Sequence, residues 1–177
     1  MILAGGTAVR LGGVDKAGIE YAGRTLLEHA LDAVAAAGEV VVVGDQVPTT
    51  RPATFVREDP PLGGPVAGLL AGRRMLAHHP ELLLVLAVDM PRVTRATAAR
   101  LLDAAAGRDG AVLVGDDGRR RLVLAVRTDR LDTAAPSDPH GHSVRALLAP
   151  LDLADVAALG DEARGVDRWE DLQDPGA

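Results

Sequence analysis

The sequence predicts an α/β fold, a three-layer α/β/α sandwich in which helices cover both faces of a mostly parallel sheet. Short apolar runs of strand length alternate with segments of helical period, a pattern typical of parallel strands joined by right-handed crossovers. The length of 177 residues fits one domain. Hydrophobic residues make up 47% of the chain and the formal net charge is only −6, so the chain can bury a core. We therefore expect residues 1–177 to form a single domain.

Strands and helices alternate through the first half of the chain. Residues 1–4 are expected to form a strand, and a glycine-rich loop follows from Gly5 to Lys16. Thr25 and Glu28 have the spacing of a capping box, which predicts a helix from there to a stop at Gly38. The elements expected next are strands at 40–43, 54–57 and 82–88 and, between the last two, a helix from Pro65 to about Leu76.

The second half adds an antiparallel element. Thr94 caps a helix that reaches about residue 106, and an Asp117-Gly118 turn joins strands at 111–114 and 122–126, which is a strong hairpin signal. Helical stretches at 143–148 and 168–173 and a strand near 153–159 close the chain. The sheet is thus expected to be Rossmann-like with an antiparallel insertion. Ligands in such sheets lie beyond the carboxyl ends of the strands, where the loops at 5–16, at 58–65 and after residue 88 converge.

Composition excludes several classes of function. The chain has no cysteine, which excludes thiolate nucleophiles and thiolate metal sites and fits a reducing compartment. A pI near 5.3 and only three aromatic residues, Tyr21, Phe55 and Trp169, argue against nucleic acid as a partner. The longest apolar run, residues 82–88, is too short to span a membrane. We expect a cytoplasmic protein that acts on small molecules.

The first loop is a candidate phosphate-binding loop. Its glycines leave backbone N–H groups open to an anion, and Arg10 and Lys16 can supply positive charge. Ala17 follows Lys16 where a P-loop has Ser or Thr, and the glycine spacing fits neither a P-loop nor a dinucleotide fingerprint. A surface turn with solvated cations explains these residues equally well.

Two aspartates follow expected strands. Asp59 stands before proline, and by itself it is better explained as a turn former. Asp89 ends a buried apolar strand, so it lies at the mouth of the cleft, where a divalent cation is a natural partner and an Asx turn is the alternative. His140 and His142 lack neighbours at metal-ligand spacing, and His78 and His79 are expected in the last turn of a helix.

Taken together, these motifs resemble those of the nucleotidyltransferases typified by molybdenum cofactor guanylyltransferase. The resemblance covers nearly the whole chain, and it implies a nucleotide-diphospho-sugar transferase-like fold. The matching segments, in chain order, are Leu3-Ala4-Gly5-Gly6 with Arg10, Gly12-Gly13 and Asp15-Lys16; Asp59 with Gly64-Pro65-Val66-Ala67-Gly68; Asp89-Met90-Pro91; Gly141-His142-Ser143-Val144-Arg145; and Asp167 with Glu170-Asp171-Leu172.

The resemblance implies a role for each matching residue. Gly6 favours GTP, because relatives that use CTP typically carry alanine there, and Arg145 faces the acceptor. Arg10, Lys16 and Asp89 form the implied catalytic set. The implied nucleotide contacts are Leu3, Ala4 and Gly5 at the guanine and ribose, Arg10 and Lys16 at the phosphates, Asp59 elsewhere on the nucleotide, and Asp89 through Mg²⁺ at the α-phosphate.

The implied activity is Mg²⁺-dependent transfer of GMP from GTP to the phosphate of molybdopterin, with release of pyrophosphate. A phosphate acceptor carries no proton that must be removed, so this chemistry needs no catalytic His or Ser. The partners are small molecules, GTP and a molybdopterin-type acceptor, without nucleic acid or membrane. The resemblance leaves room for transient contact with proteins that handle the cofactor.

Departures from the family pattern fall on the acceptor side and keep alternatives open. Arg119-Arg120-Arg121 stands where relatives often have Gln-Pro, and Arg168-Trp169 replaces Thr-Pro. A sugar phosphate or another small phosphorylated acceptor is therefore one alternative, and a non-catalytic nucleotide-binding module is another. A dinucleotide-dependent oxidoreductase with Asp45 as ribose ligand is a distant alternative, because the glycine spacing is wrong.

Overall fold

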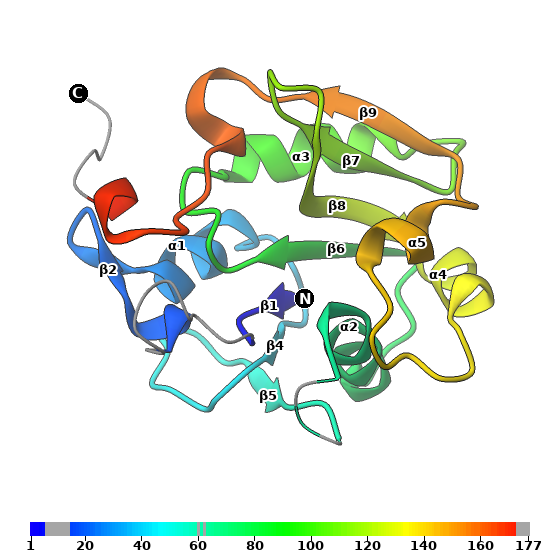
Figure 1. The fold of residues 1–177 in the computed structure, drawn as a ribbon, viewed down its shortest axis with the longest axis horizontal. Coiled ribbons are helices and arrows are strands. Elements are labelled where there is room, and N and C mark those ends of the chain that lie inside the picture. The colour runs from blue at the N-terminus through cyan, green and yellow to red at the C-terminus, as the bar shows by residue number, and fades with distance from the viewer. Residues whose placement is uncertain (6–14, 60, 62, 173–177) are drawn as a thin grey trace.

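The protein is a seven-stranded mixed sheet with helices on both faces (Figure 1). The computed structural model describes residues 1–5, 15–59, 61 and 63–172. The strand order is β5-β4-β1-β6-β8-β7-β9. No helix in the described ranges is both long enough and apolar enough to cross a lipid bilayer.

The first four strands of the sheet run parallel. The short strand β1 (Ile2–Leu3) lies between β4 (Val41–Val43) and β6 (Leu82–Ala87), and β5 (Thr54–Val56) pairs with β4 at the edge. The residues of β1 and β4 are buried, as expected for central strands covered on both faces. All four strands therefore end at the same edge of the sheet.

The expected hairpin supplies the antiparallel strand. β8 (Arg120–Arg127) is antiparallel to both β6 and β7 (Gly110–Val114), and β9 (Leu153–Ala157) runs parallel to β7 at the far edge. Gly118 has a φ of 70°, a conformation that glycine adopts without strain. The prediction of a mostly parallel sheet with an antiparallel insertion is confirmed.

Helices pack on both faces of the sheet. Apolar residues of α1 (Leu26–Ala33) and α3 (Arg95–Ala104) form one core, and those of α2 (Pro65–Met75), α4 (Thr128–Ala134) and α5 (Val144–Leu148) form the other. The two cores lie on opposite sides of the strands, which confirms the three-layer sandwich.

Local signals place α1 and α2 correctly. The capping box is present, since Thr25 Oγ1 accepts from the Glu28 amide at 3.2 Å and Glu28 Oε2 accepts from the Thr25 amide at 2.8 Å. α2 lies very close to the sheet: a Cβ at Gly72 would come within 2.7 Å of Val43 Cγ2. The small residues of α2 therefore allow the close approach that the sequence predicts.

Some boundaries differ from those expected. α1 ends at Ala33 instead of near Gly38. After it, the Ala35 amide donates to the Asp32 carbonyl at 3.1 Å and the Ala37 amide to the Val34 carbonyl at 2.9 Å. Bonds of this i to i−3 kind tighten the chain into turns, so the α-helix does not continue. α2 ends at Met75, so His78 and His79 lie beyond the helix, in the connection to β6. The expected helix at 168–173 is a short 3₁₀ helix, η4 (Trp169–Leu172), and residue 173 lies outside the described residues.

Several short elements were not expected from the sequence. The strands β2 (Glu20–Tyr21) and β3 (Arg24–Thr25) flank a tight turn and have two residues each, too few to show a period. The 3₁₀ helix η2 (Lys16–Gly18) begins where a loop was expected. α4 has a single buried apolar residue, Leu131, and no side-chain cap, so neither signal of a helix is present.

The C-terminal segment is fastened to α3 through Glu162, which lies in the 3₁₀ helix η3 (Gly160–Ala163). Its carboxylate accepts hydrogen bonds from Thr97 Oγ1 at 2.6 Å and from the Arg100 guanidinium at 2.7 Å and 3.0 Å. Burial opposes ionisation, but these bonds outweigh it and hold the pKa of Glu162 below its ordinary value. Beyond this anchor, the Val166 amide donates to the Asp89 carbonyl at 2.8 Å.

Glu162→Gln should destabilise the protein by about 2 kcal/mol at pH 7, because hydrogen bonds to a charged group are lost. A lowered pKa means that the stabilisation is complete above the ordinary value of 4.5 and is lost as pH falls through the folded-state value. Urea unfolding from pH 7 to pH 3 should show the difference from wild type shrinking. Glu81→Gln, which breaks an exposed pair with Arg127 at 2.9 Å, is the control and should change little. Equal effects of the two variants would contradict this role.

Gly110→Ala should destabilise the β7–β8 pairing. A Cβ at Gly110 would lie 2.3 Å from the Ala125 carbonyl oxygen and 2.9 Å from Val126 Cα, and backbone on the neighbouring strand cannot rotate away. We expect a loss of about 3 kcal/mol in urea unfolding, at the upper end for overpacking. Gly38→Ala is the matched control, since no atom lies within 4 Å of its Cβ position. A tolerated Gly110→Ala would mean that the hairpin pairs differently.

Candidate functional site

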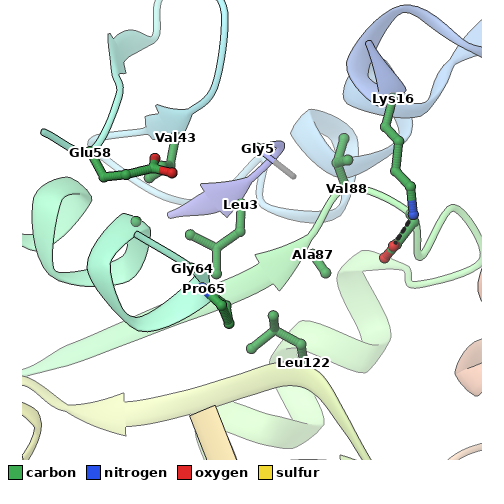
Figure 2. Close-up of a pocket in the computed structure, with 12 residues that line it drawn as sticks. Leu3, Gly5, Lys16, Val43, Glu58, Gly64, Pro65, Ala87, Val88 and Leu122 are labelled. Carbon is green, nitrogen blue, oxygen red and sulfur yellow. Dashed lines mark hydrogen bonds and ion pairs between the residues drawn. The ribbon is translucent and has the colours of Figure 1, made fainter. Parts of the chain in front are cut away.

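A cavity of about 460 Å³ opens at the carboxyl ends of β1, β4 and β6, within the volume range of small-molecule sites. Figure 2 shows the side chains around it. The loops expected to converge do so, because Gly5, Lys16, Glu58 and Asp89 all reach it. The lining residues are Leu3, Gly5, Lys16, Val43, Glu58, Gly64, Pro65, Gly68, Ala87, Val88, Asp89 and Leu122.

The strand ends are held together where the cavity begins. The amides of Ala4 and Gly5 both donate to the Val43 carbonyl at 2.8 Å, and the Val88 amide donates to the Leu3 carbonyl at 2.9 Å. These bonds continue the parallel ladders past the ends of the strands. The chain after β1 therefore leaves the sheet directly beside the chains that leave β4 and β6.

One wall of the cavity carries a cluster of charges. Lys16 Nζ lies 2.8 Å from Asp89 Oδ2 and 3.4 Å from Asp167 Oδ1. The Lys16 side chain is 19% exposed and the Asp89 side chain 27%, whereas Asp167 is largely open to solvent. Asp15 fixes the start of η2 by accepting from the Ala17 amide at 3.0 Å. Residues far apart in the sequence thus present one cation and two carboxylates at the same point.

Lys16 is the only lysine in the chain. Partial burial lowers the pKa of an ammonium group, but the hydrogen bond to Asp89 and the charges of Asp89 and Asp167 outweigh burial and raise the pKa of Lys16 above its ordinary value. The side chain therefore remains charged throughout the neutral range. It is a compact cation at the entrance of a cavity whose other walls are mainly apolar.

The opposite side of the cavity combines apolar surface with one carboxylate. Leu3, Val43 and Leu122 provide broad apolar contacts, and Glu58 lies at the rim beside α2 (Figure 2). Gly68 lies beside that carboxylate, since a Cβ built on it would be 3.7 Å from Glu58 Oε2, an ordinary van der Waals contact. An apolar slot with a hydrogen-bond acceptor at one end suits a flat, polar-edged ring.

The structure gathers several of the residues expected from sequence in this cavity. Leu3, Gly5, Lys16 and Asp89 line it. Ala4 is buried and contributes its backbone amide to the β1–β4 junction. Gly6 and Arg10 lie outside the described residues.

Asp59 is placed differently. It is exposed and is not one of the residues that line the cavity, whereas its neighbour Glu58 is. Side chains alternate along β5, and Val56 packs on the α2 side while Phe55 packs on the other. Continuing that alternation puts Glu58 on the α2 side with the cavity. Strand periodicity could therefore have identified Glu58.

Asp167 and Leu122 also reach the site without having been assigned to it from sequence. Leu122 lies on β8, and the pattern that predicts the hairpin does not show where its residues point. Asp167 follows Val166, whose amide is bonded to the backbone of Asp89. That bond joins residues far apart in sequence, so only tertiary structure reveals it.

The carboxylates of Asp89 and Asp167 could bind a divalent cation together with a substrate phosphate. Within the described ranges, no three His, Cys, Asp or Glu side chains gather closely enough to hold a metal by themselves. Asp89 and Asp167 nevertheless face one common cation, Lys16 Nζ. Mg²⁺ is usually held by one or two carboxylates, water and substrate phosphates, and these donors fit that arrangement.

Comparison with known proteins agrees with the architecture. A molybdenum cofactor guanylyltransferase of Acidiphilium cryptum (strain JF-5) is 44% identical over 110 residues, covering 57% of this chain and 55% of the relative. Another, from Shewanella sp. (strain MR-4), is 34% identical over 132 residues, covering 71% and 66%. The crystal structure of molybdopterin-guanine dinucleotide biosynthesis protein A from Archaeoglobus fulgidus has a TM-score of 0.71 at 20% identity, covering 98% of this chain and 94% of that one.

These matches differ in what they show. The structural likeness shows the fold, which is the nucleotidyltransferase-like fold that the sequence resemblance implies. The chain spans only 55% and 66% of the lengths of the two guanylyltransferases. Residues 1–165 match the family described as "MobA-like NTP transferase domain". The chain therefore belongs to the MobA-like NTP transferase domain family.

Proposed function

We propose that the protein is a nucleotidyltransferase that moves GMP from GTP to the phosphate of a molybdopterin-type acceptor and releases pyrophosphate. The observation that carries this proposal is the cluster of Lys16, Asp89 and Asp167 at the mouth of a cavity beyond the strand ends. Polyphosphates need concentrated positive charge, and nucleotides bind at this edge of α/β sheets. The names of the relatives support GTP and the molybdenum cofactor as the substrates.

In this reaction, no covalent bond to the protein has to form. The acceptor phosphate oxygen forms a bond to the α-phosphorus of GTP in line with the bond that breaks, and pyrophosphate leaves. Because the acceptor is already an anion, no general base is required. The protein must position two anions and neutralise their charge, and Lys16 is the described cation at the site that does so.

The two carboxylates fit a magnesium ion. Asp89 and Asp167 would hold Mg²⁺ jointly with the nucleotide phosphates, in keeping with the small number of protein ligands that this ion accepts. When bound, Mg²⁺ neutralises the charge that develops on the α-phosphate and the leaving group. Lys16 donates to the phosphates from beside the same carboxylates. Arg10, which lies outside the described residues, remains the other proposed phosphate ligand.

Glu58 is the proposed reader of the base. A carboxylate can accept hydrogen bonds from the N1–H and the 2-amino group of guanine at once, and adenine offers no such pair of donors. Leu3 and Val43 provide apolar walls for the ring and the ribose. Gly6, whose structure is not described, remains a further proposed determinant of GTP over CTP.

Other expectations accompany this function. The partners are small molecules, and transient contact with cofactor-handling proteins remains a prediction. The cytoplasm, where GTP is plentiful, remains the expected compartment. These statements follow from the proposed reaction and are tested together with it.

Among GTP, CTP, ATP and UTP, each with Mg²⁺, GTP should raise the melting temperature most, because a ligand at 100 times its Kd adds about 2.7 kcal/mol of stability. Glu58→Gln should abolish the preference for GTP, since the amide cannot accept two hydrogen bonds from guanine. Asp59→Asn is the matched control, and its exposed position predicts wild-type behaviour. A greater loss in Asp59→Asn than in Glu58→Gln would assign the contact to Asp59 after all.

Lys16→Arg should lower the rate of pyrophosphate release from GTP and molybdopterin by at least about a hundredfold, as removal of an electrostatic partner in the transition state typically does. The substitution keeps the charge, but a planar guanidinium cannot replace a compact ammonium between Asp89 and Asp167. Asp89→Asn should lose as much, and Asp152→Asn, which breaks an exposed pair with Arg108 at 2.7 Å, should not.

A second measurement uses the single lysine. Acetylation by an amine-reactive reagent, mapped by peptide mass spectrometry, should modify Lys16, and GTP with Mg²⁺ should slow that modification. Circular dichroism checks that each variant is folded. Full turnover in folded Lys16→Arg or Asp89→Asn, or labelling that GTP does not slow, would contradict the assigned roles.

A further inference from the structure

A second, larger cavity adjoins the first. Its volume is about 850 Å³, and residues of β7, β8, α5 and β9 line it. Leu122 lines both cavities, so the second begins where the apolar wall of the first ends. Its lining residues are Val112, Gly118, Arg119, Arg120, Arg121, Leu122, Val144, Arg145, Leu148, Ala149 and Asp155.

The lining is strongly cationic in an acidic protein. Four arginines and one carboxylate, Asp155, border this cavity, although the whole chain has a net charge of −6. Arginines elsewhere commonly sit against carboxylates, as Arg73 does against Asp132 at 2.8 Å and Arg108 against Asp152 at 2.7 Å. The four arginines here outnumber the two carboxylates that pair with them, Asp155 and Asp117.

Two of the four arginines are held by protein groups. The Arg120 guanidinium lies 2.8 Å from Asp155 Oδ1. Arg121 donates to the Ala163 carbonyl at 2.9 Å and to Asp117 Oδ1 at 3.0 Å. These bonds use some of the N–H donors of each guanidinium group and hold the Arg120 and Arg121 side chains at the rim of the second cavity.

The other two arginines are available to a ligand. Arg145, on α5, is exposed, and no carboxylate among the described residues lies within ion-pair distance of it. The Arg119 side chain is 82% exposed and only approaches Asp117, at 3.9 Å. α5 and the β7–β8 hairpin thus each bring one of these arginines to the same cavity.

We propose that this cavity binds an anionic group of the acceptor other than the phosphate that attacks GTP, and that Arg145 and Arg119 hold that group. The proposal rests on the proposed function for the nature of the ligand, but the cavity and its charge do not depend on it. Guanidinium groups bind phosphate and carboxylate through paired hydrogen bonds. An acceptor spanning both cavities would place its attacking phosphate near Lys16 and its second anion between the arginines, with its apolar body against Leu122.

The site selects a class of acceptor. A compound with a single phosphate and an uncharged remainder leaves the arginines without a partner, whereas one with a second phosphate, carboxylate or other oxyanion pairs with them. The arginines at 119–121 and 145 thus make the number of negative charges on the acceptor a determinant of specificity. Asp155 lowers the affinity of the site for an anion, because it neutralises Arg120.

The test measures binding of inorganic phosphate by NMR, read at the Nε–Hε signal of Arg119. Mg²⁺ and a GTP analogue with a methylene group between the α- and β-phosphorus occupy the first cavity. Wild type should show a saturable shift, and Arg145→Gln should weaken phosphate binding about tenfold or more, as expected for loss of a charged hydrogen-bond donor. Arg74→Gln removes an equally exposed arginine outside both cavities and should bind as wild type does.

A second variant is expected to change phosphate affinity in the opposite direction. Asp155→Asn frees Arg120 and should tighten phosphate binding, whereas Asp152→Asn should leave it unchanged. Equal affinities in wild type, Arg145→Gln and Asp155→Asn, or a shift that does not saturate, would overturn the proposal.

Binding of the GTP analogue itself, measured separately by thermal shift, distinguishes the two proposals. If the analogue binds and phosphate does not, this inference alone fails. If phosphate binds at the arginines and the analogue does not bind, the proposed function fails, and the anion site remains.

Discussion

The contact between Lys16 and Asp89 ties the site together. Lys16 stands at the start of η2 and Asp89 directly after the central strand β6, and their side chains meet at 2.8 Å. The same ammonium reaches Asp167, from a segment that the Glu162 anchor and the Val166 backbone bond carry back across the sheet. Charges from three distant parts of the chain can converge only if β1, β4 and β6 end together, so the site depends on the parallel register of the sheet.

The chain uses its two kinds of cation differently. Several arginines form exposed pairs with aspartate, and in the second cavity Arg119 and Arg145 are exposed while Arg120 and Arg121 are held by protein groups. The only lysine lies between two carboxylates, Asp89 and Asp167. Guanidinium suits exposed, bidentate contacts, whereas an ammonium with three rotatable donors suits a narrow junction. The chemistry of each cationic group therefore fits the positions at which it is found.

The antiparallel strand β8 connects the two cavities. It lies next to the central strand β6 and brings Leu122 to the first cavity, while the residues just before Leu122 reach the second cavity. Those residues, Arg119 to Arg121, are where the sequence departs from the pattern of its family. Under the proposed function, the parallel half of the sheet would hold the nucleotide and the antiparallel half would contact the acceptor.

Sequence alone determined the layers, the hairpin, the caps at Thr25 and Thr94 and the position of Asp89 at a strand end, because these depend on local period and turn chemistry. It missed α4, which has neither an apolar period nor a cap, and it did not identify Glu58, which lines the cavity next to the predicted contact Asp59. Tertiary structure alone decided that Asp167 joins Lys16, that Leu122 borders two cavities and that Arg145 and Arg119 line the same cavity. Those pairings join residues far apart in the chain, and their distances are set by packing between layers, which no local pattern records.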